Sequence, residues 1–123
     1  MRDITISVVI PTYNEEKCLR NCLSSVMNGS ELPLEIIVAD GGSSDKTVEI
    51  AKSMGAVVIN NPYKHAAGGR NEGIKIAKGN VIAFIDADCI ADKYWLQEIK
   101  NTFETEDIDG LGTYIEPAEF ANK

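Results

Sequence analysis

The 123-residue sequence has no apolar stretch long enough to span a membrane and no excess of basic residues. A membrane helix needs about 18 consecutive apolar residues, whereas ISVVIP and VIAFI, the longest runs here, have the length of a strand. The 12 lysines and arginines are scattered and outnumbered by 19 acids, so binding to nucleic acid is not expected. The N-terminus does not have the pattern of a signal peptide. We therefore expect a cytoplasmic protein; membrane association of a longer parent protein stays open.

Cysteine and histidine are also scarce. Cys18, Cys22 and Cys89 form no C-x-x-C pair, and His65 is the only histidine. A zinc site is therefore not favoured, and we expect the cysteines to be free thiols in a reducing compartment. His65 is expected to be an ordinary residue of a mobile surface loop.

Short apolar segments alternate with amphipathic segments along the chain. They predict strands at residues 5–10, 34–40, 56–60, 81–85 and 110–116, and helices at residues 14–28, 44–54, 70–78 and 92–104. Strands that are apolar on both faces and alternate with helices are typical of an α/β fold with an open, mostly parallel sheet and helices on both faces. Without repeats or linkers, residues 1–123 are expected to form one domain.

Individual residues predict where some of these elements begin and end. Pro11 should stop the first strand because it cannot donate to a sheet ladder. Asn14 is expected to cap the first helix. Ser43 or Ser44 is expected to cap the second.

Several nucleotide-binding patterns are missing from the strand ends. PTYNEE follows the first strand, where a dinucleotide-binding protein would show G-x-G-x-x-G, and no P-loop is present. Ligands of open α/β sheets bind beyond the carboxyl ends of the strands. Gly, Asn, Asp and Ser are concentrated at those ends, in residues 11–15, 40–45, 60–69 and 86–88. We therefore predict that this edge of the sheet is functional.

Asp86 and Asp88 follow the predicted strand at residues 81–85. Side chains two apart on an extended segment point the same way, so both carboxylates can reach one ligand. Hard cations such as Mg²⁺ and Mn²⁺ prefer carboxylate and phosphate oxygens. Such an ion would let a chain of net charge −7 hold an anion. The alternative is a polar strand exit without a ligand.

Three segments together resemble the nucleotide-binding part of family 2 glycosyltransferases, which have the Rossmann-like GT-A fold. They are SVVIPTYNEE, IVADGGSSDKT and GGRNEGIKIAKGNVIAFIDADC, and they span Ser7 to Cys89. The resemblance implies a UDP- or GDP-sugar as donor, Mn²⁺ or Mg²⁺ as cofactor, and inverting transfer to an acceptor hydroxyl. The acceptor (a glycan, a lipid-linked molecule or a small molecule) is not identified.

The same resemblance implies roles for individual residues. Pro11 and Tyr13 would pack on the nucleobase, in a loop shaped by Asn14 and Glu15. Asp40 would contact the base, although capping of the GGSSD turn is the alternative. The implied nucleotide-binding residues are Pro11, Tyr13, Glu15, Asp40, Arg70, Asn71 and Asp86, and the implied metal ligands are Asp88 and Asp86.

The chain departs from the family pattern in two ways. Many relatives carry a second acid where this chain has Gly41. The chain also ends 35 residues after Asp88, and no later acid matches a motif for the catalytic base. These acids are Glu104, Glu106, Asp107, Asp109, Glu116 and Glu119.

The acceptor-binding part is therefore expected to be absent. A sugar-nucleotide-binding module without turnover is the main alternative function. A nucleotidyltransferase is less favoured, because its glycine-rich basic loop is missing. Truncation also predicts self-association through an exposed sheet edge.

Overall fold

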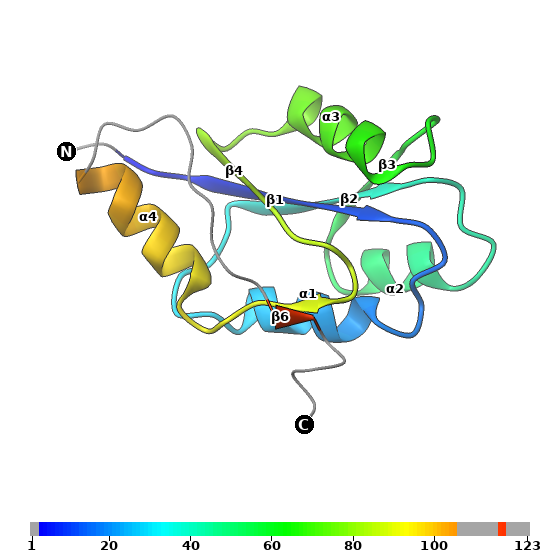
Figure 1. Ribbon diagram of the computed structural model, residues 1–123, viewed down its shortest axis with the longest axis horizontal. Coiled ribbons are helices and arrows are strands. Elements are labelled where there is room, and N and C mark those ends of the chain that lie inside the picture. Colours follow the sequence, from blue (N-terminus) through cyan, green and yellow to red (C-terminus); the bar gives the residue numbers. More distant parts are fainter. Residues whose placement is uncertain (1–2, 106–115, 118–123) are drawn as a thin grey trace.

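The computed structural model describes residues 3–105 and 116–117, and its centre is a parallel sheet between two layers of helices (Figure 1). The four strands of the sheet lie in the order β3-β2-β1-β4. They are β1 (Ile6–Thr12), β2 (Glu35–Asp40), β3 (Val57–Asn60) and β4 (Val81–Phe84). All three neighbouring pairs are parallel, so the predicted α/β fold is confirmed.

Helices cover both faces of this sheet (Figure 1). The helices on one face are α1 (Leu19–Met27), α2 (Thr47–Ser53) and α4 (Trp95–Thr105), and α3 (Ala66–Ile76) lies on the other. The i, i+3, i+4, i+7 pattern of α1 is buried as predicted, and its members are Leu19, Cys22, Leu23 and Val26. They pack in one core with Ile6, Val8 and Ile10 of β1 and with Trp95, Leu96 and Ile99 of α4.

A short antiparallel pair lies beyond β4. It joins β5 (Cys89–Ile90) to β6 (Glu116–Pro117). The sequence did not predict β5, because two residues are too few to show a period. The strand predicted at residues 110–116 lies outside the described residues except for Glu116, which belongs to β6.

Close packing of α3 on the sheet depends on glycine. A Cβ atom on Gly69 would lie 2.9 Å from Cβ of Pro11, and one on Gly73 would collide with the side chain of Val9. The helix backbone therefore lies almost directly on β1. This packing fixes the path of α3, and with it the position of Arg70 above the sheet edge.

The prediction that Pro11 stops the first strand is wrong, and the strand continues to Thr12. The carbonyl of Val9 accepts from Ile85 N (3.3 Å), so the backbone N–H and C=O groups of odd-numbered residues in β1 point toward β4. Those of even-numbered residues point toward β2, since the carbonyl of Thr12 accepts from Gly41 N (2.9 Å). Pairing with β4 ends at Val9. Pro11 thus directs its nitrogen to a side where no ladder partner remains, a place where proline is tolerated.

Three helix starts differ from the prediction. Asn14 has a φ of 53° and lies outside α1, which begins at Leu19. Neither Ser43 nor Ser44 caps α2, since Asp45 accepts from Thr47 N (2.9 Å). The third helix begins at Ala66 because the ring of His65 caps it, with Nδ1 accepting from Gly68 N (3.0 Å). His65 is an exposed residue of the loop before α3, as expected, but its capping bond was not predicted.

None of the helices in the described part of the chain has the length and apolar character needed to cross a membrane.

Candidate functional site

The strand order places a crevice at the carboxyl ends of β1 and β4. From β1 the chain moves to β2 on one side, whereas β4 lies on the other side. Such a change of direction is where open α/β sheets bind ligands. The residues leaving these two strands, 13–15 and 85–88, are among those that the sequence singled out.

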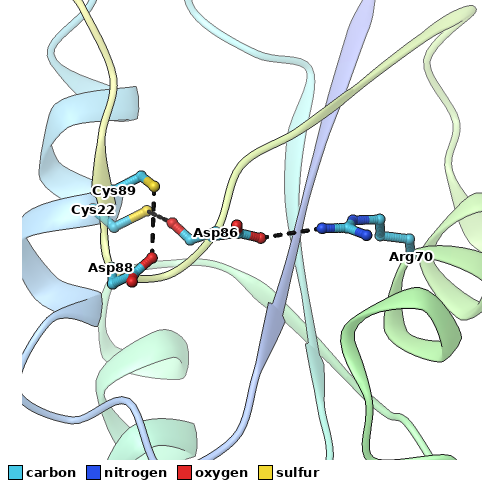
Figure 2. A network of polar contacts seen from close by, with 5 residues as sticks. All are labelled: Cys22, Arg70, Asp86, Asp88 and Cys89. Carbon is cyan, nitrogen blue, oxygen red and sulfur yellow. Dashed lines mark hydrogen bonds and ion pairs between the residues drawn. The ribbon is translucent and has the colours of Figure 1, made fainter. Parts of the chain in front are cut away.

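Asp86 and Asp88 lie at this edge with exposed side chains, and Ala87 between them is only 3% exposed. Both carboxylates are thus exposed, in a turn in which Cys89 N donates to the carbonyl of Asp86 (3.0 Å) rather than on the extended segment that the sequence predicted. Their ligand oxygens and the sulfur of Cys89 all lie within 4.8 Å of one another (Figure 2). The carboxylates have the hard oxygen donors that Mg²⁺ and Mn²⁺ prefer, so the residues fit a divalent cation.

Two cysteines form hydrogen bonds with this segment. The carbonyl of Asp86 accepts from Cys89 N at 3.0 Å and from Cys22 Sγ, on α1, at 3.5 Å. Cys89 Sγ is 3.5 Å from Oδ1 of Asp88 (Figure 2). Burial, followed by the neighbouring acids and thiols, raises the pKa of Cys22 to about 12 and that of Cys89 to about 11. Both thiols are thus protonated donors at neutral pH, and all three cysteines are free, as predicted.

Arg70 of α3 reaches the same segment. Its Nη2 lies 3.3 Å from Oδ1 of Asp86, and the two side chains are 39% and 57% exposed (Figure 2). Ion pairs at this exposure contribute little free energy because water and salt screen them. Asp86 can therefore give up its contact with Arg70 and bind a cation instead. Arg70 is then able to bind a phosphate.

Glu15 adds negative charge to the site. Burial raises the pKa of Glu15, and the carboxylates of Asp88, Asp45 and Asp86 raise it further. A group whose ionisation is opposed by three nearby acids lies in a strongly negative field. A bound cation would relieve this repulsion.

A cleft of about 160 Å³ opens beside Glu15, whose pKa the carboxylates of Asp88 and Asp86 raise, although neither aspartate lines the cleft. One wall comes from the end of β1 and brings together three predicted nucleotide-binding residues, Pro11, Tyr13 and Glu15. The other wall is the loop between β3 and α3, which lies within residues 60–69 of the predicted functional edge. The cleft is lined by Pro11, Thr12, Tyr13, Glu15, Asn61, Lys64, His65 and Ala66.

Asn61 shapes that second wall. It is 1% exposed, its Nδ2 donates to the carbonyl of His65 (2.9 Å), and its Oδ1 accepts from Tyr63 N (3.1 Å). The N-N-P sequence signals a turn, but the two bonds of the side chain have no sequence signature. Asn61 is a structural residue of the site that sequence reasoning missed.

Asn71 is not brought to the acidic cluster. It lines a separate cavity of about 470 Å³ together with Tyr63, His65, Gly68, Glu72 and Lys75. Arg70 and Asn71 are therefore directed to different surroundings although they are adjacent in sequence. The nucleotide-binding role of Asn71 stays a prediction.

Asp40 is 5% exposed at the end of β2. Burial alone would raise the pKa of its carboxyl, but hydrogen bonds from Ser43, Thr12 and Gly42 outweigh burial and hold the pKa below its usual value. The turn-capping interaction considered for Asp40 is present. The predicted contact with a nucleobase stays a prediction.

Comparison with known proteins identifies the family. The pattern of Glycosyl transferase family 2 matches residues 7–118, and the chain belongs to this family. It is 31% identical over 119 residues to glycosyltransferase AglE of Haloferax volcanii, with 90% of this chain and 39% of that protein covered. It is 37% identical over 103 residues to the Escherichia coli UDP-Glc:alpha-D-GlcNAc-diphosphoundecaprenol beta-1,3-glucosyltransferase WfgD, with 79% and 41% covered.

Solved structures share the GT-A fold. Glucosyl-3-phosphoglycerate synthase of Mycobacterium tuberculosis, in complex with Mn²⁺, UDP and glucosyl-3-phosphoglycerate, is 28% identical with a TM-score of 0.70, and 83% of this chain and 40% of that chain are covered. Residues 1–349 of Staphylococcus aureus TarS are 25% identical with a TM-score of 0.71, and 90% and 38% are covered. The chain thus spans about two fifths of the length of these relatives.

Proposed function

We propose that this chain is the donor-binding part of a family 2 glycosyltransferase, and that it binds a nucleoside-diphosphate sugar through a divalent cation on Asp86 and Asp88. The observation that carries the proposal is the pair of exposed carboxylates whose oxygens lie within 4.8 Å of each other at the point where β1 and β4 part. The M. tuberculosis neighbour binds UDP with Mn²⁺ or with Mg²⁺. These complexes support Mn²⁺ or Mg²⁺ and a UDP-sugar here, with a GDP-sugar as the alternative.

The residues of the site have distinct roles in this proposal. Pro11 and Tyr13 pack against the nucleobase. Arg70 leaves its ion pair with Asp86 and binds the diphosphate. The bound cation would act as a Lewis acid that stabilises the departing diphosphate. Inverting transfer also requires a base that deprotonates the acceptor hydroxyl, and none of the described residues is assigned that role. We place the base and the acceptor site in the part of the relatives that this chain does not match.

Calorimetric titration of UDP and GDP, with and without Mn²⁺, tests the proposal. We expect Mn²⁺-dependent binding that Asp88→Asn weakens at least about tenfold, because a charge-assisted contact of about 1.5–3 kcal/mol is lost. Glu98→Gln is the matched control, since it removes an exposed acid from α4 and should leave the Kd unchanged. Equal binding without metal, or by Asp88→Asn, would contradict the proposal.

A second function, nucleotide-sugar binding without turnover, is supported because none of the described residues is assigned the role of the base. Incubation of the chain with UDP-glucose and Mn²⁺ distinguishes the two functions. Slow release of glucose that Asp88→Asn abolishes would favour the enzyme. Binding without release would favour the module.

A further inference from the structure

The carboxylate of Asp40 has its hydrogen-bonding capacity filled by the protein. Oδ1 accepts from the hydroxyls of Thr12 (2.7 Å) and Ser43 (2.6 Å). Oδ2 accepts from the backbone N–H groups of Gly42 (3.0 Å) and Ser43 (2.8 Å). A carboxylate has about four lone-pair sites, so this arrangement leaves Asp40 no site with which to bind a nucleobase.

The next residue, Gly41, offers no side chain in its place. A Cβ atom on Gly41 would lie 3.0 Å from Cα and 3.2 Å from the carbonyl oxygen of Lys64. The backbone of the β3–α3 loop thus occupies the space that a side chain at position 41 would need. The end of β2 therefore presents no available carboxylate to the cleft at either position.

The bonds of Asp40 continue into the loop that carries Tyr13 and Glu15. The hydroxyl of Ser43 donates to Asp40 and accepts from Asn14 N (2.8 Å). The side chain of Asn14 returns the link, because its Oδ1 accepts from Ser44 N at 2.8 Å. Asn14 is in the left-handed region, which asparagine tolerates better than most residues.

Two further bonds join the same loops. Glu15 N donates to Thr47 Oγ1 (2.8 Å), and Glu16 N donates to Oδ2 of Asp45 (3.2 Å). Three consecutive backbone N–H groups, from Asn14 to Glu16, are thus held by side chains that follow β2. The loop with Tyr13 and Glu15 is therefore built as one unit with the β2–α2 loop.

We propose that Asp40 and Ser43 are positioning residues that hold the nucleotide cleft in its binding shape, and that Asp40 does not itself contact the nucleobase. This inference rests on the proposed function. A cleft that is ordered before the ligand arrives avoids the entropy cost of ordering it on binding. The side chain of Ser43 is the single group that joins the carboxylate to the β1–α1 loop.

Calorimetric titration of Ser43→Ala with UDP and GDP in the presence of Mn²⁺ tests this role. We expect the Kd for both nucleotides to rise by a similar factor of about five to ten, because the hydroxyl loses its bond to Asp40 and the bond it accepts from Asn14 N. Ser43→Thr keeps the hydroxyl and should restore binding. Ser53→Ala removes a hydroxyl that bonds within α2, so it controls for a general loss of stability. Unchanged binding by Ser43→Ala would overturn the inference.

Two variants of Asn14 give an independent test if Ser43→Ala fails to fold. Asn14→Gly keeps the left-handed backbone accessible and removes the amide, whereas Asn14→Asp keeps an acceptor oxygen. We expect weaker binding by Asn14→Gly and recovery by Asn14→Asp. Equal binding by the two variants would contradict the proposed link.

The ratio of the UDP and GDP affinities separates positioning from base recognition. Asp40→Asn should weaken both nucleotides together, and a changed ratio would show that Asp40 reads the base. A wild-type chain that binds neither nucleotide with Mn²⁺ would overturn the proposed function as well. Wild-type binding with an unaffected Ser43→Ala would overturn only the positioning role.

Discussion

At the scale of the residue, the buried charge of Asp40 links the site to the stability of the fold. Its pKa is lower in the folded protein than its ordinary value of about 3.9, since hydrogen bonds favour the ionised form. The stabilisation is therefore fully present above about pH 4 and is lost as the pH falls through the folded-state pKa.

Asp40→Asn should remove this pH-dependent stabilisation. Its amide places an NH₂ group against the donors of Gly42 and Ser43, so we expect a loss of about 1–3 kcal/mol at pH 7. The difference in unfolding free energy between wild type and variant should narrow as the pH falls below about 4 toward the folded-state pKa, because the wild-type carboxyl then takes up a proton on unfolding. Urea unfolding between pH 7 and pH 2.5 measures the unfolding free energy of wild type and variant, with Glu98→Gln as control. A gap that stays constant over this range would exclude the ionised carboxylate as the cause.

Residue positions were predictable where the local pattern determines them. The position of Asp86 and Asp88 at the strand exit followed from the sequence, but they lie in a turn closed by Cys89 N on the carbonyl of Asp86 (3.0 Å), not on the extended segment that the sequence predicted. The role of Asn14 was not predictable, because its partners lie about 30 positions later in the chain. A side chain that bonds to its own helix and one that bonds to a distant loop look the same in sequence.

At the scale of the element, α3 shows how glycine sets the distance between a helix and a sheet. Gly73→Ala should destabilise the fold by about 1–3 kcal/mol, because the new methyl group overlaps the side chain of Val9. The better helix propensity of alanine, about 1 kcal/mol, offsets part of this loss. Thermal and urea unfolding of the variant measure it.

The double variant with Val9→Ala is the control for that prediction. Removal of the Val9 methyl groups makes room for the methyl group at position 73, so the two substitutions should together cost less than the sum of their separate effects. If the losses of unfolding free energy from Gly73→Ala and Val9→Ala simply add, the methyl group at position 73 does not press on the side chain of Val9.

The hydrophobic pattern predicted the type of each described helix and of each strand of the sheet, and their order along the chain. It did not predict where the helices start. The cap of α3 is a histidine ring, which sequence preferences did not favour, and α2 has Lys46 at its N-cap position without a side-chain cap bond. The β5–β6 pair was missed because it depends on a contact between residues that are 26 or more positions apart. Boundaries of this kind are decided by tertiary contacts rather than by propensity.

At the scale of the whole molecule, the chain carries a net charge of −7 and spans about two fifths of its relatives. The acidic residues of the site contribute to this negative charge, since the chain has 12 lysines and arginines against 19 acids. The family could be predicted from the sequence because its three motifs are local. The acceptor could not, since the chain does not match the remaining part of its relatives.

Self-association through a sheet edge stays a prediction. Among the described residues β3 pairs only with β2, and Val57 on β3 is 45% exposed. Edge strands with exposed apolar residues pair readily with other chains. Sedimentation at increasing protein concentration should show a mass above that of the monomer, and Val57→Lys should lower it. A monomer at all concentrations would contradict the prediction.

The proline in β1 has a consequence for how the site can move. Pairing between β1 and β4 ends at Val9, and Pro11, two residues further along β1, has no partner on β4. Pro11 has no N–H group, so it cannot donate a further backbone hydrogen bond to β4, whether or not a ligand is present. Its carbonyl is the remaining backbone group on that side, and the loops around the site are left to adapt.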